Sequence, residues 1–250
     1  MLINDEEWKC PGHGTPIEKD GKNYFLYHAY DKESSVFTGR EGLLIEYKFT
    51  PDGWIEFVKE NEKKDVPLQN LKDGFKGRRL GENWQWSVFQ PATYTQRGGE
   101  LTLGSAPTVS GAYVGTKTTS GNYTATVKLR PKKTNAAAGL GAIGDDKNLV
   151  SAYWQTGTLL VMQTRNGEAA IMAQKDLATS KSLYLKMQVA NGKDITFFYS
   201  TDGDKYYTLN EQTIDGSYLP PWDRSIRVGL LSKGAEGQKA VFDTFHLNNQ

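Results

Sequence analysis

The chain has 250 residues, and hydrophobic side chains make up 38% of them, enough to bury a core and to exclude bulk disorder. Lys and Arg number 30 and Asp and Glu 29, so the formal net charge is +1 and no basic excess indicates nucleic-acid binding. No run of 18 apolar residues predicts a membrane span, and the single cysteine, Cys10, excludes an intrachain disulfide framework.

The first 60 residues predict one small antiparallel sheet. Aromatic and aliphatic runs at 24–30, 43–49 and 54–58 are typical of strands, and Asp-Gly turns at 20–21 and 52–53 separate them. A sheet of three or four strands exposes both faces and is marginal in water. We therefore expect it to dock on the rest of the chain, because its apolar side chains would otherwise form an aggregation-prone patch.

A charge run at 59–65, followed by Pro67, predicts a linker. We place two domains on either side, 1–62 and 63–250. The alternative is a solvated loop within a single domain.

From residue 73 onward the pattern is all-β, with no helix longer than a turn or two. About a dozen short strands separated by turns favour a two-sheet jelly-roll sandwich. The predicted strands are 84–89, 100–103, 123–129, 138–143, 149–154, 159–163, 169–173, 183–190, 195–200, 206–209, 226–231 and 240–247.

The amino-terminal motifs resemble a known series. They are Cys10-Pro11-Gly12-His13-Gly14-Thr15, Asp20-Gly21, Tyr24-Phe25-Leu26-Tyr27-His28-Ala29-Tyr30, Gly39-Arg40 and Pro51-Asp52-Gly53-Trp54. Over residues 8 to about 60 they resemble the last blade of the five-bladed β-propeller of glycoside hydrolase family 43. That family comprises arabinofuranosidases, β-xylosidases and arabinanases.

The remainder, from about 68 to 250, resembles the concanavalin A-like sandwich that follows this propeller. The motifs are Asp73-Gly74-Phe75, Leu80-Gly81-Glu82-Asn83-Trp84-Gln85-Trp86 and Phe242-Asp243-Thr244-Phe245. Similar domains serve as carbohydrate-binding modules, including xylan-associated ones. The resemblance therefore implies an accessory or carbohydrate-binding role on arabinose- or xylose-containing plant cell-wall polysaccharide.

The chain departs from the family where catalysis is concerned. An inverting glycosidase needs two carboxyl groups about 6.5–9.5 Å apart, and the family carries its Asp, Asp and Glu on earlier blades. No pair within residues 1–60 matches them, and Asp31 and Glu33 are interpreted as solvated loop residues. We therefore expect no catalytic residue in this chain and no activity from it alone.

Three functional hypotheses stay open. The chain is the carboxy-terminal accessory part of a hydrolase, from a shortened gene or a deliberate cut. Alternatively, it is an active β-xylosidase or arabinofuranosidase once the remaining propeller blades complete it, or it is a purely structural sandwich. Residues 1–7 show no signal peptide, and the resemblance implies a secreted or periplasmic parent enzyme.

Four residues are candidates for sugar contact. The resemblance places His13 near the active-site floor, beside a cation or sugar, and Arg40 within reach of the sugar; the alternatives are a turn histidine and a surface arginine. His28 is interpreted as a packed strand residue. Trp154 and the loop residue Trp222 are candidate sugar platforms, whereas Trp84 and Trp86 are expected in the core.

The resemblance also implies a structural Ca²⁺ held by Asp73 and Asp243 where the first and last strands of the sandwich meet. The alternative is two ordinary turn and strand-edge aspartates. Cys10, with no catalytic histidine–acid pair nearby, is expected to be a small buried thiol.

Overall fold

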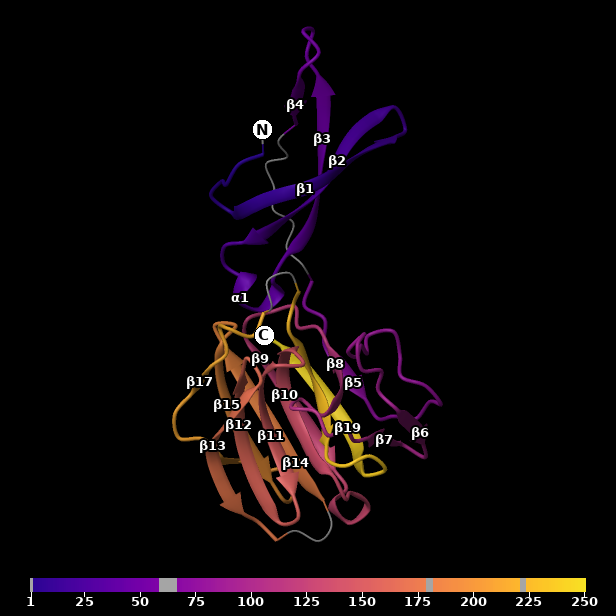
Figure 1. Cartoon of the computed structure of the whole chain (residues 1–250), viewed down its shortest axis with the longest axis vertical. Helices are drawn as coiled ribbons and strands as arrows, with labels where there is room; N and C mark the ends of the chain where they lie inside the picture. The colour runs from indigo at the N-terminus through magenta and orange to yellow at the C-terminus, as the bar shows by residue number, and fades with distance from the viewer. Residues whose placement is uncertain (1, 59–66, 179–181, 221–223) are drawn as a thin grey trace.

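In the computed structural model, residues 2–58, 67–178, 182–220 and 224–250 are described, and nearly all of their regular secondary structure is strand (Figure 1). A four-stranded sheet comes first in the chain, and two larger sheets follow it. The prediction of a blade-like antiparallel sheet followed by a β-sandwich is confirmed. The proposed boundary at 62–63 and most of the predicted linker lie outside the described residues. No described helix is long and apolar enough to cross a membrane.

The four-stranded sheet, here called the blade, is antiparallel in chain order. Its strands are β1 (Trp8–Lys19), β2 (Lys22–Asp31), β3 (Glu41–Phe49) and β4 (Ile55–Phe57). Asp20 and Gly21 both have positive φ, 53° and 74°, as the tight hairpin between β1 and β2 requires. The strand β1 was not predicted, because its prolines and glycines hide the alternation and two register shifts interrupt its pairing.

The sandwich consists of a six-stranded sheet and a nine-stranded sheet. In spatial order the six-stranded sheet is β13 (Glu168–Asp176), β12 (Thr158–Arg165), β11 (Asn148–Gln155), β10 (Ala137–Asp145), β18 (Arg227–Lys233) and β8 (Ala112–Thr116). The nine-stranded sheet is β16 (Tyr207–Thr208), β15 (Asp194–Ser200), β14 (Leu183–Ala190), β9 (Tyr123–Leu129), β19 (Lys239–Asn249), β7 (Glu100–Gly104) and β6 (Tyr94–Arg97), with β17 (Ile214–Asp215) on β15 and β5 (Leu71–Asp73) on β19. A 3₁₀ turn, η1 (Pro131–Lys133), follows β9.

The main core lies between these two sheets. In β9, for example, Tyr123, Ala125, Val127 and Leu129 are buried while the residues between them are half-buried, so alternate side chains enter the core. A smaller apolar cluster that includes Tyr113, Tyr153 and Leu231 lies on the other face of the six-stranded sheet. That sheet is therefore buried on both faces over its central strands.

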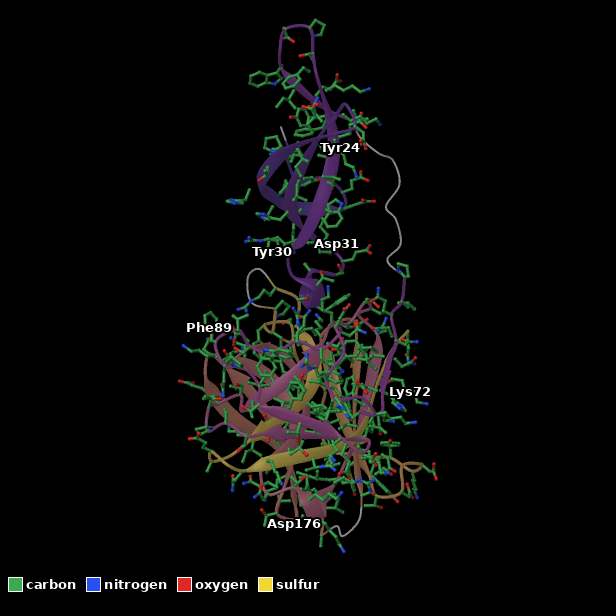
Figure 2. The ribbon with its side chains drawn as sticks, turned by 90° about the vertical axis from the view of Figure 1, so that its right-hand side faces the viewer. Tyr24, Tyr30, Asp31, Lys72, Phe89 and Asp176 are labelled. Atoms are coloured by element: carbon green, nitrogen blue, oxygen red, sulfur yellow. The ribbon has the colours of Figure 1, made fainter. Side chains whose placement is uncertain are left out.

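The predicted strand at 84–89 is wrong. Only Gln85 pairs, in an isolated bridge to Gly115, and the segment otherwise runs as a loop. Trp86, Val88 and Phe89 are exposed at its surface, so the apolar run reflects an uncovered loop rather than a strand with a core face. Figure 2 shows Phe89 at the edge of the sandwich.

One short helix, α1 (Ser35–Thr38), joins the blade to the sandwich (Figure 1). Phe37 is 8% exposed and belongs to the main core, where its ring lies close to Gly121 and Gly192. The backbone N–H of Ile226 donates to the carbonyl oxygen of Phe37 at 3.1 Å. The expected docking is therefore present, but it runs through α1 and leaves apolar side chains of the blade uncovered.

Candidate functional site

Two histidines, an arginine and a tyrosine gather at the end of the blade nearer the sandwich. The pairing of Gly12 with His28 brings β1 and β2 together here, and the His13 and His28 rings stack with centroids 6.5 Å apart. His13 has a left-handed backbone, φ 44°, in an irregular stretch of β1, and the residue is exposed. Tyr30 lies at this same end, while Tyr24 lies further from the sandwich (Figure 2).

Arg40 completes this cluster. Its guanidinium lies over the Tyr30 ring, 5.8 Å from the centroid, and its buried Nε has no hydrogen-bond partner among the described residues. Partial burial, followed by the charges of Arg40 and His13, lowers the pKa of His28. A neutral imidazole beside a guanidinium offers one acceptor and several donors, which suits sugar hydroxyls or a carboxylate.

Asp31 ends β2 beside this cluster, and the expectation that it is solvated is wrong. It is 4% exposed, and its Oδ1 accepts hydrogen bonds from the N–H groups of Glu33 at 2.8 Å and Ser34 at 3.0 Å. These bonds form the turn that leads into α1. Asp31 therefore shapes the junction between the blade and the sandwich.

The blade exposes paired apolar side chains on both of its faces. Leu26 and Leu44 are directly opposite each other and are 45% and 60% exposed. Phe49 and Ile55, another direct pair, are 60% and 42% exposed and point to the other face, because successive side chains in a strand alternate. Each face therefore has apolar surface available for a neighbouring layer.

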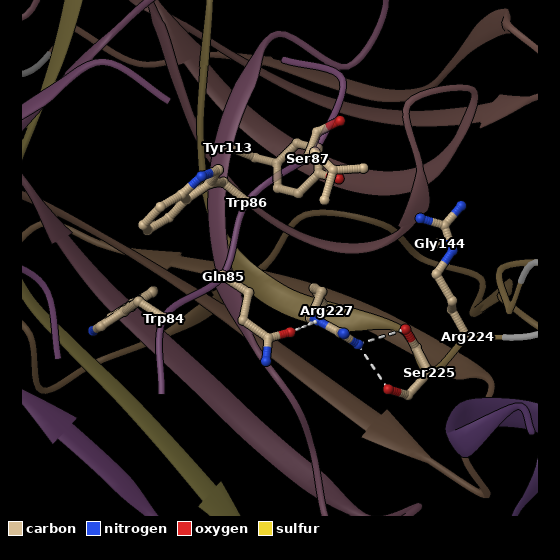
Figure 3. Close-up of a pocket in the computed structure, with 10 residues that line it drawn as sticks. Trp84, Gln85, Trp86, Ser87, Tyr113, Gly144, Arg224, Ser225 and Arg227 are labelled. Carbon is tan, nitrogen blue, oxygen red and sulfur yellow. Dashed lines mark hydrogen bonds between the residues drawn. The ribbon is translucent and has the colours of Figure 1, made fainter. Parts of the chain in front are cut away.

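A pocket of about 380 Å³ lies on the sandwich and shares a wall with the junction (Figure 3). The short segment 224–227 provides that wall: Arg224 touches Gly39 through its backbone, and Ile226 bonds to Phe37. The loop after β5 forms the opposite wall. The lining residues are Trp84, Gln85, Trp86, Ser87, Val88, Tyr113, Gly144, Arg224, Ser225 and Arg227.

Hydrogen bonds fix the polar side of this pocket. Arg227 Nε donates to Gln85 Oε1 at 2.5 Å, and its Nη1 donates to the carbonyl oxygen and Oγ of Ser225, both at 2.7 Å. Ser87 Oγ donates to Asp146 Oδ2 at 2.9 Å, just outside the lining. Burial, and then the charge of Asp146, raises the pKa of Tyr113, so its phenol stays protonated as a donor.

The remaining tryptophans and the cysteine that the sequence singled out lie in different environments. Trp154 lies in the main core at 8% exposure, so its indole ring presents no face to solvent and we leave it out of the site. Trp222 lies outside the described residues. Trp84 is buried as expected, but Trp86 is 41% exposed in the pocket, and Cys10 is exposed rather than buried.

Asp73 and Asp243 lie near each other in the topology, since Asp73 on β5 pairs with Phe245 on β19. Asp73 accepts from Phe75 N–H at 2.7 Å and Trp84 Nε1 at 2.8 Å. Asp243 pairs with Lys128 at 2.9 Å and Arg130 at 2.8 Å.

Protein donors thus occupy both carboxylates, and two cations beside one of them oppose a further cation. No three potential metal ligands cluster in the described part of the chain. This arrangement does not fit a shared Ca²⁺, and the calcium site stays a prediction for direct metal analysis.

Comparison with known proteins begins with a family profile. The profile of the β-xylosidase C-terminal concanavalin A-like domain matches residues 72–248. No curated protein matches the chain significantly.

Three solved structures share the fold along nearly the whole chain. A glycoside hydrolase family 43 protein from Bacillus licheniformis superposes with a TM-score of 0.75 at 22% identity, covering 100% of this chain and 55% of its own. A xylan β-1,4-xylosidase from Bacillus halodurans gives 0.77 at 19% identity, covering 97% and 54%. A family 43 protein of a Bacteroides ovatus xyloglucan locus gives 0.78 at 20% identity, covering 98% and 55%. The chain thus spans about half the length of these structures.

Proposed function

Because the chain belongs to the family of β-xylosidase C-terminal concanavalin A-like domains, we propose that it is the accessory part of a glycoside hydrolase. The proposed substrate is plant polysaccharide that contains xylose or arabinose. In this proposal the sandwich holds the blade in position, and the blade contributes His13 and Arg40 to an active site whose carboxylates lie on other propeller blades.

The main support for this proposal is that apolar side chains are exposed on both faces of the blade. A sheet that ends a domain needs one apolar face, whereas a propeller blade packs against a neighbour on each side. The pairs Leu26–Leu44 and Phe49–Ile55 provide such surfaces on opposite faces. The remaining propeller blades are therefore the proposed partners, and Phe37 anchors the assembly to the sandwich.

The first experiment tests whether the chain hydrolyses glycosides alone or only together with further propeller blades. We expect the chain alone to leave 4-nitrophenyl xyloside and arabinofuranoside intact, because no pair of carboxyl groups within residues 1–60 matches the acid and base of the family. Joined to four amino-terminal blades of a family 43 propeller, it should support hydrolysis. Arg40→Ala should then lower kcat/KM by about 100-fold, the cost of losing one oriented donor, and the exposed Lys48→Ala is the matched control.

Hydrolysis by the chain alone, abolished by changing one of its own carboxylates, would overturn the accessory role. Equal activity of the Arg40→Ala and Lys48→Ala assemblies would instead remove Arg40 from the sugar site.

Glycan binding by the sandwich is the second candidate function, and the pocket with its exposed Trp86 favours it. A pull-down on insoluble arabinoxylan, with cellulose as the control, distinguishes a binding domain from a purely structural one. Retention on arabinoxylan that Trp86→Ala removes is the expected result. Equal recovery from both polysaccharides would support the structural role.

A further inference from the structure

The pocket beside the junction places an accessible aromatic ring opposite two guanidinium groups. Figure 3 shows the rings of Trp86 and Tyr113 on one side and the side chains of Arg224 and Arg227 on the other. Its volume of about 380 Å³ falls within the range of about 300–1,000 Å³ that is typical of small-molecule sites. The site is therefore large enough for a sugar ring and its substituents.

The described lining of the pocket contains no carboxylate that could balance the charge of Arg227. Arg227 is partly buried, and its described hydrogen bonds all end on neutral oxygens of Gln85, Ser225 and Ile226. No carboxylate in the described part of the chain forms an ion pair with it. Burial, and then the nearby charge of Arg224, lowers the pKa of Arg227, as expected for a partly buried cation beside another cation.

A partly buried guanidinium is stabilised by an anion that accepts from its free donors. Gln85, Ser225 and Ile226 occupy Nε and Nη1 of Arg227, whereas its Nη2 group donates to none of the described residues. A carboxylate can accept from this Nη2 group, and such a charge-assisted hydrogen bond is stronger than one between neutral groups. The Trp86 ring lies across the pocket at 41% exposure, where it can stack on an apolar sugar face.

We propose that this pocket binds a carboxylate-bearing sugar, that is, a uronic acid unit carried by a plant oligosaccharide. Arg227 and Arg224 contact the carboxylate, Trp86 stacks on the ring, and Ser87 and Gln85 lie within reach of its hydroxyls. The inference rests on the proposed carbohydrate role, and it assigns this role to a site on the sandwich rather than to the blade.

The test compares two soluble probes of equal backbone length. The first is xylotriose that carries one glucuronic acid, and the second is unsubstituted xylotriose; both are titrated into the full chain by calorimetry. We expect saturable binding of the acidic probe that is about tenfold or more tighter than that of the neutral one, a difference that one good charge-assisted contact supplies. Sodium phosphate, added at the same concentration of negative charge as the acidic probe, should displace that probe only weakly.

Variants then locate the binding site. Trp86→Ala should weaken acidic-probe binding at least about tenfold. Arg227→Lys should weaken it as well, because the compact ammonium of a lysine cannot keep the contacts to Gln85 and Ser225 and also donate to the carboxylate. Phe89→Ala removes a neighbouring aromatic ring that is 81% exposed and does not line the pocket, so it should leave binding unchanged. Circular dichroism checks that each variant is folded.

Each remaining outcome overturns the assignment. Equal affinity for the two probes would exclude carboxylate recognition, equal competition by phosphate would indicate a general anion site, and no saturable binding would exclude the site. Unchanged affinity in folded Trp86→Ala would place binding elsewhere. None of these results bears on hydrolysis by the completed propeller, so failure here and failure of the proposed function are distinguishable.

Discussion

Phe37→Ala should loosen the blade from the sandwich while both parts stay folded. The Phe37 ring is 8% exposed in the main core, whereas the blade strands themselves take little part in that core. Truncating a buried phenylalanine costs about 3–5 kcal/mol. Because this ring joins the two parts, most of the loss should fall on their docking equilibrium, where about 3 kcal/mol corresponds to more than a 100-fold change.

Amide hydrogen exchange measured by NMR reports on this contact directly. The Ile226 N–H donates to the Phe37 carbonyl, so its exchange should accelerate by about 100-fold in the variant if docking limits its protection. Amides of β9, such as that of Val127, should change much less, because they bond within the sandwich.

Phe49→Ala, which removes a ring that is 60% exposed on the blade, is the matched control and should leave Ile226 unaffected. Unaltered Ile226 exchange in folded Phe37→Ala would refute the argument that α1 anchors the blade.

Three further expectations concern the sandwich. Trp84→Phe should lower the free energy of unfolding by about 1–3 kcal/mol in urea denaturation, because Asp73 loses the indole donor at 2.8 Å. A loss smaller than that of the surface variant Phe89→Ala would contradict this prediction. Burial raises the pKa of Tyr218 from 10.0 to about 12, so its neutral phenol stabilises the fold below pH 10 and this contribution is lost as the pH rises through about 12. Between pH 10 and 12 the melting temperature of Tyr218→Phe should therefore fall less than that of the unaltered chain. Asp243→Ala should lower the melting temperature equally with Ca²⁺ and with chelator, because Lys128 loses its carboxylate partner and Arg130 keeps only Glu100. A loss seen only with Ca²⁺ would support the calcium site.

Strict alternation made part of the fold predictable. Residues 123–129 were predicted as a strand and are β9, because every second side chain is apolar and enters the core. The segment 84–89 has an equally strong strand composition, yet only Gln85 pairs. Composition shows that a segment suits a pleated surface, whereas pairing depends on whether a neighbouring strand is available.

The candidate site was predictable only where a local motif carried it. The Gly-His-Gly sequence identified His13, and the structure adds His28 and Tyr30, whose proximity depends on strand register. The pocket had no local signal: Gln85 and Arg227 are 142 residues apart, and their hydrogen bond exists only once β8 and β18 are adjacent. Trp86 was expected in the core because the Trp-x-Trp segment resembles part of the fold's own signature. Its exposure depends on the same long-range arrangement and has no local signal.

The junction and the pocket share the segment 224–227, so docking and ligand binding should be coupled. Ile226 bonds to Phe37 at the junction, while the adjacent Arg227 side chain lines the pocket. Suppose that the acidic oligosaccharide binds the chain more tightly when the blade is docked on the sandwich than when it is not. The oligosaccharide must then raise the docking equilibrium constant by the same factor by which docking raises its affinity. The glucuronic acid-substituted xylotriose should therefore slow Ile226 exchange in Phe37→Ala, and that variant should bind the probe more weakly than the unaltered chain. Trp86→Ala, which leaves the junction intact, should lose probe binding without accelerating Ile226 exchange. Two results together would show that the pocket and the junction are independent despite their common wall. Phe37→Ala would bind the probe as tightly as the unaltered chain, and the probe would not change the exchange rate of the Ile226 amide.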